Sequence, residues 1–412
     1  MDSFADLIAP FSRRGVDLGL ERLQAALAEL GHPEQRFEAV QVAGTNGKGS
    51  ICAFVEAGLR AAGIRCGLYT SPHLLCWSER IRIDATPIAA PELRRILETL
   101  QPLGLRFDLT PFELITAAAF VAFAEAGVDL AVLEVGLGGR LDATTCHPRR
   151  NLIGFAAIGL DHAEVLGPTA AAIAAEKAGV LQPGARAFSA RQSPEVSAVL
   201  EAAAQRQGAT LRWLEPLDPA AWPLALAGEV QQGNGAVARA LLRALAADGW
   251  PIDEAAMRAG LAAARWPGRL QCWQWRGRPL LLDGAHNLPA AQQLRAELDA
   301  NPWRHGLTPG PRHWVIGILA SKQGPEMLAA LLGPGDRAWL VPVPEHASWS
   351  RAALLAALLE AQPGQPALAQ QLAEQLEESP DLTAALEAAS AAASSRVVVA
   401  GSLYLLGALL AA

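Results

Sequence analysis

Residues 44–50, with the sequence Gly-Thr-Asn-Gly-Lys-Gly-Ser, constrain the fold of this chain more than any other stretch. An apolar run at 39–42 precedes them, and apolar residues at helical spacing follow them as far as Gly63. Between a strand and a helix, glycines let backbone N–H groups point toward an anion, and the helix N-terminus adds partial positive charge. Lys48 would reach the terminal phosphates, and the Ser50 hydroxyl would bind a magnesium ion. The stretch predicts a phosphate-binding loop formed by Gly44, Thr45, Asn46, Gly47, Lys48, Gly49 and Ser50.

Two features of the loop depart from the common pattern. That pattern places Ser or Thr directly after the Lys, whereas Gly49 stands there in this chain, and Val42 occupies the position of its first Gly. The alternative is a glycine-rich turn that only links strand to helix. The joint presence of Thr45, Lys48 and Ser50 between the two elements favours phosphate binding.

Length and charge limit the classes of protein that the chain can belong to. With 412 residues, of which 51% are hydrophobic, we expect two domains with well-filled cores. The formal net charge of −7 argues against a general nucleic-acid binder, because no basic excess is present to neutralise phosphates.

The five cysteines are odd in number and have no CxxC spacing, so they indicate core residues in a reducing compartment and not a disulfide or zinc framework. The first ten residues carry Asp2 and Asp6 and no basic segment, which argues against a signal peptide. No apolar stretch has the length of a membrane span. We therefore expect a cytoplasmic protein without a membrane contact.

The first two thirds of the chain alternate between predicted strands and helices, which indicates an open parallel sheet. The predicted strands lie at 39–42, 65–69, 128–135 and 152–158, and the predicted helices at 18–30, 51–63, 90–100, 110–127, 169–179, 231–247 and 253–264. Ligands of such sheets bind beyond the carboxyl ends of the strands. Lys48, Glu134 and His162 follow predicted strand ends, and we expect them to converge.

Pro267 and Gly268 mark the predicted domain boundary, with domains at 1–268 and 269–412. Beyond it the alternation restarts, with strands at 280–283, 313–319, 338–343 and 397–401. Helices are expected at 289–298, at 325–332, across an Ala/Gln/Leu-rich stretch that ends near 393, and from 402 onward. The predicted fold class is α/β: a phosphate-loop domain with a parallel sheet, followed by a smaller Rossmann-like α/β domain.

Seven motifs in order along the chain resemble the folylpolyglutamate synthase/dihydrofolate synthase family. They are the phosphate loop, Ser71-Pro-His-Leu74 with Glu79-Arg-Ile81, Leu133-Glu-Val-Gly-Leu-Gly-Gly-Arg-Leu-Asp-Ala-Thr144, Glu176-Lys-Ala-Gly179, Trp266-Pro-Gly-Arg-Leu270, Asp283-Gly-Ala-His-Asn287 and Gly401-Ser-Leu-Tyr404. The resemblance covers nearly the whole chain. The family belongs with the Mur ligases among the ATP-dependent amide ligases.

The resemblance implies the chemistry. ATP phosphorylates a carboxylate to an acyl phosphate, and the amine of L-glutamate attacks it to give an amide. The acceptors it implies are dihydropteroate, in the dihydrofolate synthase reaction, and reduced folates, which receive further glutamates. It also implies two Mg²⁺ ions, allows a K⁺ ion, and points to a monomer whose partners are small molecules and not nucleic acid.

The resemblance also assigns roles to single residues. Ser50, Glu134 and His162 match magnesium ligands, and Lys177 matches a lysine carried as a carbamate, whose oxygens would bind metal. A helix-surface lysine beside Glu176 is the alternative for Lys177. The catalytic set is Lys48, Lys177 and His162. The second group of nucleotide contacts is Asn234, Arg269, Asp283 and His286.

Two further segments match positions that contact the pterin substrate. Phe112 would stack on the pterin ring, or else simply pack in the core, and Glu113 or Asp142 would accept its N–H groups. Thr110 is a predicted helix N-cap followed by proline at the first helical position. The implied substrate-binding residues are Ser71, His73, Arg80, Thr110, Phe112, Glu113, Leu141, Asp142 and Ala143.

Two other functions remain as alternatives. A Mur-type ligase acting on a nucleotide-linked cell-wall precursor is disfavoured by the Ser71 and Thr110 segments, and a non-catalytic nucleotide-binding protein by the intact catalytic set. A GTPase switch would need an Asn-Lys-x-Asp motif, which the sequence lacks. Three positions depart from the family pattern: Thr145, Val230 and Gln323.

Overall fold

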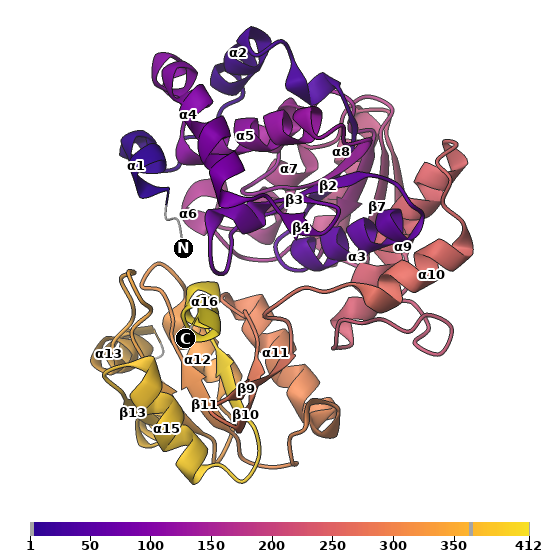
Figure 1. Cartoon of the computed structure of the whole chain (residues 1–412). Helices are drawn as coiled ribbons and strands as arrows, with labels where there is room; N and C mark the ends of the chain where they lie inside the picture. The colour runs from indigo at the N-terminus through magenta and orange to yellow at the C-terminus, as the bar shows by residue number, and fades with distance from the viewer. Residues whose placement is uncertain (1–3, 362–365, 412) are drawn as a thin grey trace. The chain divides into compact units, whose positions relative to one another are not determined.

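The computed structural model describes residues 4–361 and 366–411 and divides into two units (Figure 1). The first unit holds the described residues up to Leu226 together with Val230–Trp266. The second unit holds Ala227–Glu229 and the described residues from Pro267 onward. The division lies between Trp266 and Pro267, two residues before the expected boundary. The sequence analysis did not predict that residues 227–229 belong to the second unit.

The first unit is built on an eight-stranded sheet. β3 pairs antiparallel with β2 and with β4, and all other neighbours are parallel. The strand order is β4 (Thr86–Pro87), β3 (Ile81–Ile83), β2 (Cys66–Tyr69), β5 (Leu130–Glu134), β1 (Glu38–Ala43), β6 (Leu152–Phe155), β7 (Arg186–Ala190) and β8 (Thr210–Leu214).

Helices cover both faces of this sheet, as continuous apolar strands require. Val40 and Val42 of β1 pack in one core with α3 (Lys48–Ala61), α9 (Val230–Ala247) and α10 (Glu254–Ala263). Ala39, on the opposite face of the same strand, packs in a second core with the helices α2 (Glu21–Glu29), α4 (Ala90–Phe107) and α5 (Pro111–Glu125). Ala43 joins a third core with α7 (Ala170–Ala178) and α8 (Pro194–Arg206).

Some elements of the first unit were not predicted. β7, α8 and β8 lie between 186 and 214, where the sequence analysis proposed no elements. α4 continues through Pro102 to Phe107, although it was expected to end near residue 100. The remaining short helices are α1 (Ala5–Ile8), α6 (Ala163–Leu166) and the 3₁₀ turns η1 (Ala9–Arg14), η2 (Pro33–Gln35), η3 (Trp77–Arg80) and η4 (Ala143–Cys146).

The second unit is built on a six-stranded sheet that is parallel except for the edge strand β9. Its order is β13 (Leu376–Glu378), β12 (Arg337–Leu340), β11 (His313–Ile316), β14 (Val397–Ala400), β10 (Arg278–Leu282) and β9 (Gln271–Trp275). Its helices are α11 (Leu288–Ala300), α12 (Gly324–Leu331), α13 (Arg351–Ala361), α14 (Pro366–Gln375), α15 (Leu382–Ala392), α16 (Leu403–Ala411) and the turn η5 (Pro302–His305). The predicted α/β class of both domains is confirmed.

The Ala/Gln/Leu-rich stretch was predicted as helix throughout, and this is wrong at Leu376–Glu378. These residues form β13, because they pair in parallel register with Ala338–Leu340 of β12. The part of the prediction that falls on 362–365 lies outside the described residues. Within the described ranges, no helix combines the length and the apolar character needed to cross a membrane. All five cysteines are free thiols.

Candidate active site

Strand order brings the predicted site segments of the first unit to one edge of the sheet. β1 lies between β5 and β6, and Val42 is in register with Glu134 on one side and with Gly154 on the other. The three strands are parallel, so the segments that follow them leave from the same edge. These segments carry the phosphate loop, Glu134 and His162, and the expected convergence of these segments at one sheet edge is found.

The phosphate loop is fixed to the segment that follows β6. The backbone N–H groups of Thr45 and Asn46 donate to the carbonyl of Ala157 at 2.8 and 3.1 Å. The Thr45 hydroxyl donates to the Gly159 carbonyl and accepts from its N–H, both at 3.1 Å. Gly44 has φ +144°, and a Cβ there would lie 2.7 Å from the Ala156 Cβ. Only glycine therefore fits this approach of two backbone segments.

Lys48 and Ser50 stand in the first turn of α3, whose N-terminus presents the partial positive charge that favours anions. The Lys48 ammonium donates to the Thr45 carbonyl at 3.2 Å, which holds the side chain over its own loop. The Ser50 Oγ is buried and has no hydrogen-bond partner within the described residues. A buried hydroxyl without a partner is costly unless a ligand satisfies it, so Ser50 fits an oxygen ligand of a cation.

Glu134 and His162 differ in their surroundings. Glu134, the last residue of β5, is buried, and its Oε2 accepts from the backbone N–H of Ser71 at 3.3 Å. His162 is 43% exposed in its side chain and has a left-handed backbone with φ +51°. Its ring lies 3.6 Å from Glu164 and 3.9 Å from Asp161, nitrogen to oxygen. Glu134 is thus buried at the end of β5, whereas His162 is partly exposed beside two carboxylates.

Lys177 is buried in the last turn of α7, although the alternative from sequence was a surface lysine. Burial, and after it the charge of Lys48, lowers the pKa of Lys177 to about 7, while attraction to Asp161 and Asp142 opposes the shift. A large fraction of this amine is therefore neutral near pH 7, in contrast to a free lysine. Only a neutral amine can react with carbon dioxide to form a carbamate.

Asp142 organises the loop that follows β5. Its Oδ2 accepts from the N–H groups of Gly136 and Leu137, both at 2.9 Å, and its Oδ1 accepts from the N–H and hydroxyl of Thr144 at 3.0 and 2.5 Å. Burial raises the pKa of this carboxyl against the lowering effect of these donors. In this structure four donors occupy the two carboxylate oxygens, and the expectation that Asp142 accepts pterin N–H groups stays a prediction.

The same loop packs on the helix that carries Lys177. A Cβ on Gly139 would lie 2.8 Å from the Lys177 carbonyl oxygen, and a Cβ on Gly179 would lie 2.3 Å from the Arg140 Cβ. Arg140 also pairs with Glu176 at 3.0 Å. The motif at 133–144 and the motif at 176–179 therefore pack directly against each other.

Thr110 is the N-cap of α5, as predicted, with its hydroxyl accepting from Glu113 N–H at 3.2 Å and Pro111 at the first position. The Glu113 carboxylate is buried, accepts from the Thr110 N–H at 2.7 Å, and pairs with Arg22 at 3.2 Å. The half-buried Phe112 ring lies over Gly136, whose Cβ would come within 2.4 Å of it. Glu113 is therefore engaged in capping, and Phe112 in packing, in the absence of substrate.

Two other predicted substrate residues lie in the segment after β2. The Arg80 Nε donates to the His73 Nδ1 at 2.9 Å, and the Arg80 guanidinium lies 4.2 Å from the centre of the Trp77 ring. Burial, and then the charge of Arg80, lowers the pKa of His73 to about 4, so this ring is neutral at physiological pH. Leu141 is half-buried, and Ala143 packs in the core beside α5.

Asn234 of α9 lies against the phosphate loop, as its predicted role requires. A Cβ on Gly47 would lie 2.6 Å from the Asn234 Oδ1, and Gly47 has φ +98°. The Asn234 amide donates to Gln231 at 3.0 Å, which fixes its orientation. Glycine is needed at residue 47 for both its backbone conformation and this approach.

In the second unit, Arg269, Asp283 and His286 gather around the end of β10. Asp283 accepts from the N–H groups of Leu270 and Ala285 at 3.0 and 2.9 Å. Burial raises its pKa, and Arg269 is the largest opposing influence. The His286 Nδ1 lies 2.8 Å from the Gly284 carbonyl and must carry the proton, because a carbonyl only accepts. Asp283 and His286, which the sequence placed past one strand end, thus lie in one cluster with Arg269 from the segment before β9.

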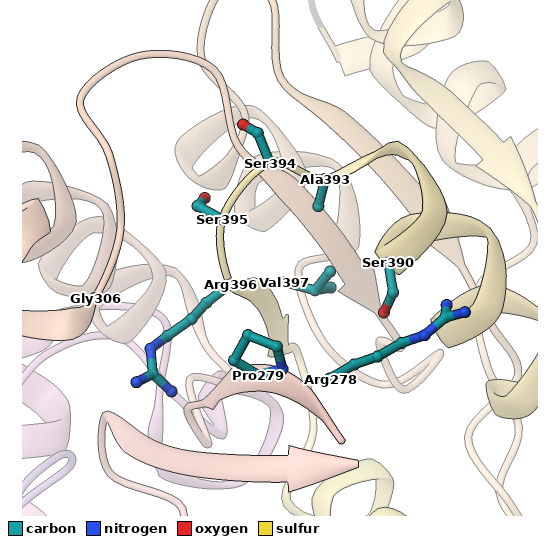
Figure 2. A pocket seen from close by; sticks show the side chains of 9 residues that line it. All are labelled: Arg278, Pro279, Gly306, Ser390, Ala393, Ser394, Ser395, Arg396 and Val397. Carbon is teal, nitrogen blue, oxygen red and sulfur yellow. The ribbon is translucent and has the colours of Figure 1, made fainter. Parts of the chain in front are cut away.

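A cavity of about 370 Å³ opens at the opposite edge of the second sheet, where β10 and β14 begin (Figure 2). Figure 2 shows Pro279 and Val397 between the side chains of Arg278 and Arg396. No predicted site residue lines it. The cavity is therefore separate from the Asp283 cluster, which follows the other end of β10.

Comparison with known proteins agrees with this geometry. Residues 270–412 match the family described as "Dihydrofolate synthetase, C-terminal domain". The dihydrofolate synthase/folylpolyglutamate synthase of Bacillus subtilis is 36% identical over 317 residues, which cover 68% of this chain and 72% of the relative. The chain belongs to the dihydrofolate synthase/folylpolyglutamate synthase family.

Solved structures of the family agree with the fold. Escherichia coli FolC in complex with DHPP and ADP superimposes with a TM-score of 0.85, at 30% identity, over 100% of this chain and 97% of that chain. A bifunctional folylpolyglutamate synthase/dihydrofolate synthase with Mn, AMPPNP and L-glutamate bound gives a TM-score of 0.81 at 28% identity, over 100% and 98%.

The family assignment implies ATP and a divalent metal ion, and the residues present fit both. The loop and the α3 N-terminus suit a phosphate, and the unpartnered Ser50 Oγ with the buried Glu134 offers hard oxygens. Among residues 4–361 and 366–411, no three His, Cys, Asp or Glu side chains are grouped to hold a metal. A Mg²⁺ ion would need few protein ligands, because substrate phosphates supply others.

The three departures from the family pattern have different surroundings. The Thr145 hydroxyl donates to the Gly139 carbonyl at 2.8 Å and accepts from Gln41 at 3.0 Å, so it braces the Asp142 loop. Val230 begins α9 and is 42% exposed. Gln323 precedes α12 without capping it through its side chain.

Several residues that position the family motifs were given no role in the sequence analysis. Trp266 lies on Gly49, and the Gln192 amide bonds the backbone of Ala156 and Ile158 at the end of β6, each at 3.0 Å. The buried Arg150 donates to the carbonyls of Thr145 and Val180. No local pattern marks Gln192 or Arg150, because their partners are backbone groups distant in sequence.

Proposed function

We propose that the chain joins L-glutamate to 7,8-dihydropteroate and adds further glutamates to reduced folates. As a family member it is an ATP-dependent acid–amino-acid ligase that uses a divalent metal ion. The observation that carries the proposal is the phosphate loop at the same sheet edge as Glu134, with a Ser50 Oγ that has no hydrogen-bond partner among the described residues. The relatives solved with DHPP and ADP, and with AMPPNP and L-glutamate, support the substrate classes.

The residues contribute mainly charge and position. Lys48 neutralises part of the charge on the ATP phosphates, and the N–H groups of the first turn of α3 stabilise them. Meanwhile a carboxylate oxygen of the pteroate attacks the γ-phosphorus and the bond to ADP breaks. The glutamate amine then attacks the acyl carbon, loses a proton, and phosphate leaves. Ser50 and Glu134 would hold the metal ion, which when bound supplies further positive charge to the phosphates. We assign His162 a place in this metal site, and Asn234, Arg269, Asp283 and His286 to the nucleotide.

We also propose that Lys177 carries a carbamate. Its neutral amine would attack the carbon of CO₂ and lose one proton, leaving an anion with two oxygens. The lowered pKa supports the reaction, and the anion removes the cost of a buried ammonium beside Lys48. A ¹³C NMR carbamate signal after equilibration with ¹³C-bicarbonate, absent in Lys177→Ala, is expected. Full activity of Lys177→Ala would contradict the role.

Substrate contacts are proposed at Ser71, His73, Arg80, Thr110, Phe112, Glu113, Leu141 and Ala143. Asp142 is proposed as a substrate contact too, in addition to holding the loop that follows β5. In this proposal Phe112 stacks on the pterin ring. We further propose a monomeric, cytoplasmic enzyme that K⁺ activates, which light scattering and assays in K⁺ against Na⁺ buffers would test.

Measuring ADP release with different acceptors tests the proposed ligase function. Assays run in parallel with dihydropteroate and with tetrahydrofolate, each with and without L-glutamate, are expected to show release that needs both acceptor and glutamate. Product mass should rise by one glutamyl residue per turn. Release that is absent with both acceptors, or independent of glutamate, would overturn the proposal. The pattern across the two acceptors tells which of the two synthase activities the chain has.

A further inference from the structure

Trp266 is the last residue of the first unit, directly before the chain enters the second. Its indole is half-buried and packs against the core that contains Ile51 and Phe54 of α3. Nothing in the chemistry described above uses this side chain. It nevertheless lies against Gly49 of the phosphate loop.

The indole occupies the space that a side chain on residue 49 would need. A Cβ built on Gly49 would lie 2.6, 2.7 and 2.8 Å from Nε1, Cε2 and Cζ2 of Trp266. Real Cβ atoms essentially never lie this close to a non-bonded heavy atom, and the obstacle is a rigid ring and not the end of a flexible chain. Any residue larger than glycine would have to displace the ring.

The backbone at residue 49 does not itself require glycine. Gly49 lies within α3 and is not among the glycines with positive φ, in contrast to Gly44 and Gly47. Alanine is the better residue at an ordinary helical position. The position of the Trp266 indole, and not the backbone conformation at residue 49, therefore explains why glycine stands between Lys48 and Ser50.

We propose that Trp266 is a positioning residue of the phosphate loop. Its ring rests on the first turn of α3 and restricts the motion of the two flanking residues, Lys48 and Ser50, that face the nucleotide. The backbone N–H groups of this turn are the ones that a phosphate would bind, so a fixed turn gives a pre-organised site. The inference rests on the proposed function for the identity of the ligand, a nucleoside di- or triphosphate with its divalent metal.

Equilibrium binding of Mg-ADP to four forms of the full chain tests this: Gly49→Ala, Trp266→Leu, the double variant and the unchanged protein. Gly49→Ala is expected to weaken binding by about tenfold, because overpacking shifts the turn. Trp266→Leu should weaken Mg-ADP binding less, by about threefold, because the smaller side chain restricts the first turn of α3 less. The double variant should bind more tightly than Gly49→Ala alone, because leucine leaves room for the added methyl group.

Values of KM for ATP and of kcat distinguish a change in the position of the phosphate loop from a general loss of folded protein. KM for ATP should rise in Gly49→Ala while kcat falls less, and Trp266→Phe should lie between the unchanged protein and Trp266→Leu. Trp303→Leu, which removes a 67% exposed tryptophan in the second unit, is the matched control and should change neither value. Thermal unfolding shows whether each variant folds, and the comparison of Gly49→Ala with the double variant uses folded proteins only.

Two results would overturn the inference. One is Mg-ADP binding by Gly49→Ala equal to that of the unchanged protein, and the other is a double variant no better than Gly49→Ala. Failure of the ligase assay would contradict the proposed function instead. Mg-ADP binding needs no acyl acceptor, so the two failures are distinguishable.

Discussion

The ammonium of Lys48 repels that of Lys177, and this repulsion adds to burial, the larger effect, in lowering the pKa of Lys177 to about 7. An unfolded chain would give the same amine its ordinary pKa of about 10.4. The native protein therefore bears the cost of a buried charge whenever this amine is protonated. The cost would be relieved by deprotonation, by a bound anion, or by modification of the amine.

Lys177→Met is therefore expected to stabilise the ligand-free protein while it abolishes ligase activity. Below pH 7 both native and unfolded states hold the proton, and the native state bears the full cost. Between pH 7 and about 10 the native state loses the proton first, and the cost disappears. With about 1.4 kcal/mol per pKa unit, the gain at pH 6 should be roughly 2–4 kcal/mol.

The measurement is the apparent melting temperature of ligand-free protein at pH 6 and pH 9.5. The increase over the unchanged protein should reach about 5 °C at pH 6 and be smaller at pH 9.5. Lys322→Met, which changes a lysine of the second unit, is the matched control. A gain that is equal at both pH values would show that the protonation of Lys177 is not its cause.

Ser50→Ala should separate metal use from stability. The hydroxyl has no partner within the described structure, so its removal is expected to change the free energy of unfolding by less than about 0.5 kcal/mol. The Mg²⁺ concentration for half-maximal ADP release should rise by about tenfold or more, as removal of an oxygen ligand requires. Ser390→Ala, at another buried Oγ without a hydrogen-bond partner among the described residues, is the matched control. An unchanged Mg²⁺ requirement would exclude Ser50 as a ligand.

Asp142→Asn should destabilise the loop that packs on the Lys177 helix. One of the two oxygens becomes an NH₂ group that faces donors, either the N–H pair of Gly136 and Leu137 or the N–H and hydroxyl of Thr144. We expect a loss of about 2–3 kcal/mol in urea unfolding, together with at least a tenfold fall in kcat. A variant of full stability that loses only affinity for the pterin would show direct contact instead.

Substitutions of Arg22 and Glu113 should have non-additive effects on the free energy of unfolding. They form a pair at 3.2 Å between α2 and α5, with Glu113 buried and also bonded to the Thr110 N–H. A double-mutant cycle with Arg22→Gln and Glu113→Gln is expected to give a coupling energy of about 1–2 kcal/mol. Additive losses would mean that Glu113 acts only as a helix cap.

The parts of the fold that follow local rules were predictable. The Thr110 cap with Pro111, the apolar runs of β1, β5 and β6, and the glycine loop between β1 and α3 each show their structure within a few residues. Elements with weak patterns were not found: β8 is half exposed, and β13 has the composition of the helices around it. For such segments pairing with a neighbouring strand decides the structure, and no local window contains that neighbour.

Some features of the candidate site could likewise be predicted from the sequence, and others depend on the tertiary structure. The residue types for phosphate and metal, Lys48, Ser50 and Glu134, and their places after strands can be read from the sequence, because strand–loop–helix order fixes the edge at which they emerge. The tertiary structure alone decided which carboxylates accept internal hydrogen bonds and which lysine has a lowered pKa. Asp142 and Glu113 are held by distant or backbone donors, and the pKa of Lys177 depends on burial. Likewise the sequence determined that residue 49 is glycine, but only the position of the Trp266 ring, over 200 residues away, gives the physical reason.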